Sequence, residues 1–337
     1  MRPLLIVSGQ ALARADGLNL VRRLRDESWV DEMAERLPRS QRFCLDALLR
    51  EAAADAPLLG RFVAGIRRIA REERRMLSRK RQHLRLFAVL AKQANDRSVL
   101  HLTTNVDGLT TAVATAMHGV PWPGTGETLA LADLENRISQ KIKQNRGLIH
   151  IPLHGEAGLL LGDLPEAELR YQFLDQGFDS PLGHMTPTLF LGAAGGLESI
   201  ESRLPTTALA LRLALQMLRG AHPWDEGMDS PPGTSVAADF LLLGHGVGTR
   251  ADPPSSPVRR LIQQTVALPP GNAGRRIAVL HVSSSQLART WLREQGFEIS
   301  LYAADLAVQA EEVLATLSLT KTQSIRSVLD PVEPVCF

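Results

Sequence analysis

Short apolar runs, separated by stretches with helical periodicity, constrain the fold of this chain more than any other feature of its sequence. Each run has the length of a buried strand and ends at small or polar residues. The runs are residues 4–7, 98–103, 148–153, 236–243, 277–282 and 297–302. Strands that alternate with helices favour a parallel sheet covered on both faces. We therefore predict an α/β protein with a Rossmann-like parallel sheet, helices on both of its faces, and a smaller, mainly helical module.

The order of these patterns along the chain predicts its domain organisation. The 337 residues are enough for one large domain and one smaller one. We expect the Rossmann-like domain to comprise residues 1–31, 95–155 and 236–320. Residues 32–94 are predicted as a helical insertion, residues 156–235 as a small inserted module, and residues 321–337 as a C-terminal tail.

The charge of the chain is nearly balanced, but its basic residues are locally concentrated. The formal net charge is +2, so the molecule as a whole does not favour a polyanionic partner. Arg and Lys outnumber the acidic residues in the predicted helix of residues 67–85. We interpret this excess as a solvated helix face, and contact with nucleic acid or an acidic partner is the alternative that we favour less.

The distribution of apolar residues bears on the location of the protein. No run reaches the roughly 18 uncharged apolar residues that a membrane-spanning helix needs, and the N-terminal run is too short for a signal peptide. We therefore expect a cytoplasmic protein without membrane contact. Its two cysteines, Cys44 and Cys336, are expected to be reduced, and we also expect a homo-oligomer.

Polar residues and glycines gather where the predicted strands end. In open parallel sheets, ligands bind outside the carboxyl ends of the strands, where backbone amides converge. The candidate ligand-binding residues at these ends are Ser8, Gly9, Asp16, Thr104, Asn105, Asp107, His154, Gly244, His245, Gly246 and Ser283. Their shared position is the main evidence for a site. In contrast, His101, His150 and His281 lie within predicted strands and are interpreted as core residues.

Each motif has a chemical interpretation and a plainer structural one. A glycine at position 9 would let the backbone approach a pyrophosphate, although an ordinary turn also uses glycine. Asn105 is suited to bind ribose hydroxyls or orient a water, and Asp107 to accept from a carboxamide; either residue could instead cap the following helix. His154 offers an imidazole for proton transfer near neutral pH, although a lone histidine is more often structural.

Taken in order, these motifs resemble those of the sirtuin-like proteins. That family shows a Gly-Ala-Gly-x-Ser loop, then Thr-Gln-Asn-Ile-Asp-x-Leu, then His-Gly, then a strand that ends in Gly-Thr-Ser. Here the corresponding segments are TTNVDGL at residues 103–109, LHG at residues 153–155 and ADFLLLGHGVG at residues 238–248. The first loop keeps Gly9 and ends in Asp16-Gly17-Leu18, where the family has Ser-Gly-Ile.

The resemblance implies that NAD is the substrate and assigns roles to matching positions. It implies that Asn105 and His154 are catalytic and that Asp107 contacts the nicotinamide amide. Gly9 would border the diphosphate, with Ser8, Asp16 and Thr104 also binding NAD. Gly244, His245 and Gly246 would flank the adenosine half, and Ser283 would lie on the adenine side.

Departures from the family pattern favour one of its branches. Ala11 and Ala13 replace a glycine and a serine, and Thr104 replaces the glutamine. The module after His154 has no cysteine, so we expect no structural zinc. The chain therefore resembles the divergent, zinc-free bacterial branch that cleaves NAD and often acts in antiphage defence.

We therefore expect an NAD glycohydrolase that releases nicotinamide and ADP-ribose. One alternative is an NAD-dependent protein deacylase or ADP-ribosyltransferase. Another is a catalytically inactive subunit that binds NAD or ADP-ribose and serves a protein partner in a defence complex. The altered first loop is the best support for this last alternative.

Overall fold

The fold centres on a six-stranded sheet in which every pair of neighbouring strands is parallel. The computed structural model describes residues 1–39, 41–42, 45–116, 128–143, 146–156, 158–161, 168–171, 186–188, 204–220, 236–245, 256–266 and 274–326. The strands are β1 (Leu4–Ser8), β2 (Ser98–Thr103), β4 (Gly147–Pro152), β8 (Asp239–Leu243), β9 (Arg276–His281) and β10 (Glu298–Tyr302). They match the six predicted runs and confirm the predicted α/β class.

The strand order is β10-β9-β8-β1-β2-β4. The chain moves outward from β1 to β2 and β4, returns to β8 on the other side of β1, and continues to β9 and β10. This is the order of a doubly wound dinucleotide-binding sheet, and its direction reverses between β1 and β8. Ligands of such sheets bind outside the carboxyl ends at this switch point.

Burial explains why the central strands are almost continuously apolar. All five residues of β1 and all six of β2 are buried. Their side chains alternate between the two sheet faces, so Leu5 and Val7 enter one core cluster while Leu4 and Ile6 enter another. Both faces are therefore covered.

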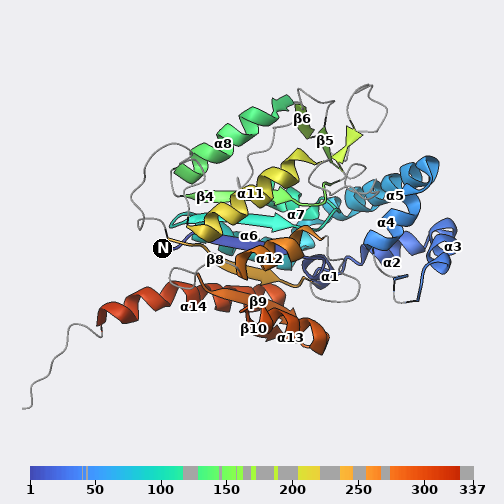
Figure 1. Ribbon diagram of the computed structural model, residues 1–337. Coiled ribbons are helices and arrows are strands. Elements are labelled where there is room, and N and C mark those ends of the chain that lie inside the picture. Colours follow the sequence, from blue (N-terminus) through green and yellow to red (C-terminus); the bar gives the residue numbers. More distant parts are fainter. Residues whose placement is uncertain are drawn as a thin grey trace, which may run out of the picture.

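Helices form a layer on each face of the sheet (Figure 1). The layer that packs around Leu5 contains α8 (Leu131–Lys143), α11 (Pro205–Arg219), α12 (Pro257–Val266) and α13 (Gln286–Glu294). The layer that packs around Leu4 contains α1 (Ala11–Ala15), α6 (Arg81–Ala94), α7 (Leu109–Ala116) and α14 (Leu306–Arg326). None of the helices in the described part of the chain is both long and apolar enough to cross a membrane.

An N-terminal helical region has a core of its own and extends to the right of the sheet in Figure 1. It consists of α2 (Leu20–Arg25), α3 (Ser28–Arg36), α4 (Leu45–Ala53), α5 (Ala56–Arg75) and the 3₁₀ helix η1 (Leu77–Arg79). Trp29 packs edge-on against Phe62, and the Arg61 guanidinium lies 4.7 Å from the Trp29 ring centroid. Asp55 caps α5 by accepting from the Leu58 N–H.

Two further parts of the chain pack on or beside the parallel sheet. Helix α6, predicted as part of the insertion 32–94, packs on β2 and β4 and so completes the sheet domain. Within residues 156–235, the described segments include β5 (Leu159–Leu161), β6 (Glu168–Tyr171) and β7 (Thr186–Pro187), which join β3 (Thr128–Ala130) in an antiparallel sheet. Helix α11, from the same range of residues, packs on β1 and β4 of the parallel sheet.

Candidate functional site at the carboxyl edge of the sheet

Backbone hydrogen bonds hold the turns after β1, β2, β4 and β8 side by side. The Thr104 N–H donates to the Ser8 carbonyl at 3.0 Å, and the Leu153 N–H donates to the Thr103 carbonyl at 2.7 Å. The Gly9 N–H donates to the Leu243 carbonyl at 3.0 Å. These bonds extend the ladder beyond the strands. The turns after β4, β2, β1 and β8 are therefore neighbours along the carboxyl edge, which includes the switch point between β1 and β8.

Two candidate glycines are required by the protein's own packing. A Cβ on Gly9 would lie 2.9 Å from the Gly244 carbonyl oxygen and 2.9 Å from the His245 Cα. Gly244 has φ +56°, and a Cβ there would lie 2.3 Å from the Cβ of Ala11. The turns after β1 and β8 therefore pack directly on one another.

Asn105 is the candidate residue whose side chain is best placed for a ligand. It is only 2% exposed, and its backbone N–H donates to the Thr103 hydroxyl at 3.2 Å. Its Nδ2 donates to the Thr110 hydroxyl at 3.3 Å, while its Oδ1 is buried without a hydrogen-bond partner. An unsatisfied buried carbonyl costs about 1–3 kcal/mol, so a retained one calls for an explanation. A ligand or water that donates to Oδ1 would supply the missing bond.

His154 and His245 form a pair of neighbouring imidazoles at this edge. His154 follows Leu153 in the turn after β4 and is partly exposed. Burial, with a smaller contribution from His154, lowers the pKa of His245 to about 3. His245 is therefore neutral near pH 7. His154, the imidazole of the LHG motif, is the candidate of the two for proton exchange with a ligand.

The structure shows Asp107 in the helix-capping role that was one of its two interpretations. Its Oδ1 accepts from the Leu109 N–H at 2.8 Å, at the start of α7. The side chain is buried, and burial raises the pKa of its carboxyl group. Asp107 thus anchors the turn that carries Asn105.

Asp16, predicted to bind the cofactor, caps helix α6. Its two oxygens accept from the backbone N–H groups of Gln82 and His83, each at 2.9 Å, and from His83 Nδ1 at 2.6 Å. Burial acts to raise the pKa of Asp16, but these hydrogen bonds outweigh it, and the pKa is lowered. The carboxylate is therefore committed to α6.

Among the other candidates, Ser8 and Thr104 are engaged within the sheet. The Ser8 hydroxyl is fully buried, 2.9 Å from His101 Nε2 and 3.2 Å from the Thr103 hydroxyl. The Thr104 hydroxyl donates to the Ser8 carbonyl at 3.4 Å. Gly246 lies outside the described residues.

Ser283 stands on the exposed turn after β9. Its Oγ lies 2.6 Å from His281 Nδ1, and Nε2 of the same ring donates to the Ala303 carbonyl at 2.9 Å. His281 is only partly buried, which corrects its interpretation as a core residue, since it is the last residue of its strand. His101 and His150, by contrast, are fully buried, as predicted.

The sequence patterns do not identify two residues that support Asn105, namely Thr110, which contacts its side chain, and His83, which contacts Thr110. His83 Nε2 lies 3.3 Å from the Thr110 hydroxyl, which in turn accepts from Asn105. His83 is in the basic segment that was interpreted only by its charge, and no motif marks it. Thr110 directly follows the TTNVDGL motif, and this position is the only sequence feature that could have indicated its role.

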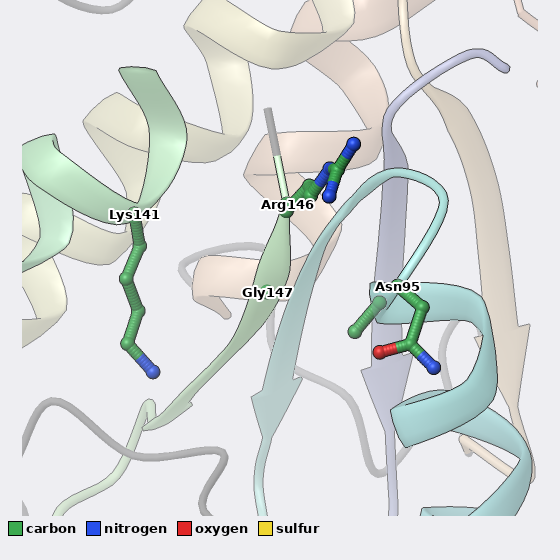
Figure 2. A pocket seen from close by; sticks show the side chains of 5 residues that line it. Asn95, Lys141, Arg146 and Gly147 are labelled. Carbon is green, nitrogen blue, oxygen red and sulfur yellow. The ribbon is translucent and has the colours of Figure 1, made fainter. Parts of the chain in front are cut away.

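The described residues also contain a cavity of about 500 Å³ away from this edge. It lies at the amino ends of β2 and β4, and is lined by Ala94, Asn95, Lys141, Arg146 and Gly147 (Figure 2). Burial lowers the pKa of Lys141, whose Nζ donates to the Leu148 carbonyl at 3.5 Å. The cavity is therefore separate from the candidate site.

A scan against models of protein families and a search of curated proteins both found no match to this chain. No group of three or more His, Cys, Asp or Glu side chains within the described ranges is arranged to hold a metal ion. The fold class is therefore established by the sheet itself, and the activity is a matter for proposal.

Proposed function

We propose that this protein is an NAD glycohydrolase that cleaves the bond between nicotinamide and ribose. The observation that carries the proposal is the buried, unsatisfied Oδ1 of Asn105 beside the switch point of the sheet. His154, on the adjacent turn, supplies an imidazole. The order of motifs that resembles the sirtuin-like proteins supports NAD as the ligand.

The proposed reaction breaks the glycosidic C–N bond and adds water to the ribose carbon. Nicotinamide leaves with the bonding electron pair, water contributes its oxygen, and one proton is released along with ADP-ribose. Because the leaving group is already cationic, the residues need to position rather than activate it. Asn105 Oδ1 accepts a hydrogen bond from the attacking water or a ribose hydroxyl, and His154 takes up the proton.

Purified protein incubated with NAD should release nicotinamide, measured by chromatography. Asn105→Ala and His154→Ala should each reduce the rate by about 100-fold or more, the scale of positioned proton transfer and orientation. Asn95→Ala is a matched control, because it removes an amide at the opposite edge of the sheet. Undiminished turnover in both site variants would exclude the mechanism.

The packing of the first turn favours a second candidate, a subunit that binds nucleotide without cleaving it. The His245 ring and the Gly244 carbonyl occupy the space beside Gly9 where a diphosphate would approach. Calorimetry that detects ADP-ribose or NAD binding, with no nicotinamide released over hours, would support this candidate over the hydrolase.

A further inference from the structure

A chain of buried hydrogen bonds joins Asn105 to Asp16, a residue far from it in the sequence. Asn105 Nδ2 lies 3.3 Å from the Thr110 hydroxyl, which lies 3.3 Å from His83 Nε2. Nδ1 of the same histidine lies 2.6 Å from Asp16 Oδ2. The His83 side chain is fully buried and that of Asp16 is 4% exposed. Solvent therefore does not compete for these bonds.

The groups of this chain form a consistent series of donors and acceptors. The Asp16 carboxylate can only accept, so His83 Nδ1 carries a proton, and in the tautomer with that proton alone Nε2 is an acceptor. Thr110 then donates its hydroxyl proton to His83, and its oxygen is left to accept from Asn105. An amide placed beside that oxygen offers Nδ2. The Oδ1 of Asn105 is consequently turned away from the chain.

We propose that Asp16, His83 and Thr110 are positioning residues that present Oδ1, rather than Nδ2, of Asn105 to the ligand. The inference rests on the proposed function and deepens it. It explains why the amide is held by one end while the other end stays unsatisfied. Without the chain, the amide could turn over and offer a donor where the reaction needs an acceptor.

The surroundings of His83 keep the Asp16 end of the chain in place. Lys80, at the start of α6, forms a buried ion pair with Glu73 of α5, and its Nζ donates to the Asp16 backbone carbonyl at 3.3 Å. Asp16 itself caps α6. The chain is thus built on rigid elements, as accurate positioning requires.

The sharpest test compares two substitutions at Thr110. Thr110→Val keeps the shape but removes the hydroxyl, whereas Thr110→Ser keeps the hydroxyl. We expect Thr110→Val to lower kcat for nicotinamide release by about 100-fold, the cost of a mispositioned group, with little change in KM, and Thr110→Ser to retain most activity. Thr265→Val is the control, since it removes an equally buried threonine hydroxyl in α12.

A structural defect is separated from mispositioning by calorimetry with ADP-ribose. A misfolded fraction of the protein would lower the binding stoichiometry. Thr110→Val should therefore bind ADP-ribose with the wild-type stoichiometry. If Thr110→Val does not fold, His83→Gln and His83→Leu replace it: glutamine keeps one donor and one acceptor and should retain activity, whereas leucine should not. A wild-type kcat in Thr110→Val or His83→Leu would overturn the inference. So would an equal loss of kcat in the two variants at Thr110, or in the two variants at His83.

A second measurement keeps this inference distinct from the proposed function. The side-chain amide signals of Asn105 can be assigned in ¹⁵N spectra by their loss in Asn105→Asp. We expect their protons to exchange slowly in the wild type and in Thr110→Ser, and rapidly in Thr110→Val. A wild type that releases no nicotinamide but shows this pattern refutes the hydrolase and retains the positioning chain. Identical exchange in all three proteins refutes the chain.

Discussion

The histidine pair in the centre of the sheet should make the protein lose stability in mild acid. His101 of β2 and His150 of β4 are register partners, and their Nδ1 atoms lie 2.9 Å apart. The Nε2 atoms lie 2.9 Å from the hydroxyls of Ser8 and Thr111. Both rings are fully buried, with Phe87 packed edge-on against them. Neither ring is exposed to bulk solvent that could stabilise a charge.

The size and sign of the effect follow from proton binding. Burial, with a smaller contribution from His83, lowers the pKa of His101 to about 3, and burial together with His101 lowers the pKa of His150 well below its usual value. In the unfolded chain both titrate near 6.5, so as pH falls the unfolded state binds protons that the folded state does not. Between about pH 7 and pH 5.5 this costs roughly 1.3 kcal/mol per ring and roughly 2.5 kcal/mol for the pair.

Urea unfolding at these two pH values measures the loss directly. The double variant His101→Gln/His150→Gln should lose about 2.5 kcal/mol less than the wild type over the same interval, whatever its absolute stability. The imidazole proton signals of both rings should also stay constant in wild-type NMR spectra across this range. The reasoning is refuted if the variant and the wild type have the same pH dependence, or if two buried rings titrate near 6.5.

Three further substitutions test the packing around the site. Gly244→Ala should lower the free energy of unfolding by about 1–3 kcal/mol in urea titrations, because its φ is +56° and the new Cβ would overlap Ala11; an unchanged midpoint would contradict this. Arg97→Met should cost about 3–5 kcal/mol by the same measurement, since it removes the guanidinium that lies 3.6 Å from the buried Asp239 carboxylate, and Asp239→Asn in the same chain should recover part of the loss. Asp16→Ala should cost about 1–2 kcal/mol through the lost cap of α6. Because the pKa of Asp16 is lowered in the folded state, its contribution to stability is present above about pH 3.8 and is lost as pH falls below that value. The difference in unfolding free energy between Asp16→Ala and the wild type should therefore narrow only below that pH.

The parallel sheet could be predicted because burial leaves a direct trace in the sequence. A strand such as β1, with Leu4, Leu5, Ile6 and Val7 fully buried on both faces, must be continuously apolar. The polar residues that follow it mark the carboxyl edge for the same reason. The antiparallel sheet left no such trace, because strands as short as Leu159–Leu161 show too few residues for a period to emerge.

The functions of individual polar residues could be predicted only where they act locally. Asp107 caps the helix that directly follows it, and capping was one of its two interpretations. Asp16 caps a helix that begins at Arg81, across the whole N-terminal helical region, and no local pattern reports such a contact. His83 was hidden for the same reason, since its partners come from two other segments.

The histidine pair and the candidate site are connected through the backbone of Asn105. Its N–H donates to the Thr103 hydroxyl, which accepts from Ser8, and Ser8 in turn accepts from His101. This second chain holds the backbone of Asn105, as the first holds its side-chain nitrogen.

Both chains end in buried groups: Asp16, whose pKa its hydrogen bonds lower, and His101, whose pKa burial lowers to about 3. The carbonyl oxygen is then the one hydrogen-bonding group of the Asn105 side chain that neither chain satisfies. The two neutral histidines reduce stability in acid, but they hold in place the turn on which that oxygen sits. Loss of the His101 ring should therefore disturb the site as well as the sheet, and in His101→Gln the slow exchange of the Asn105 amide protons should decrease along with the rate of nicotinamide release.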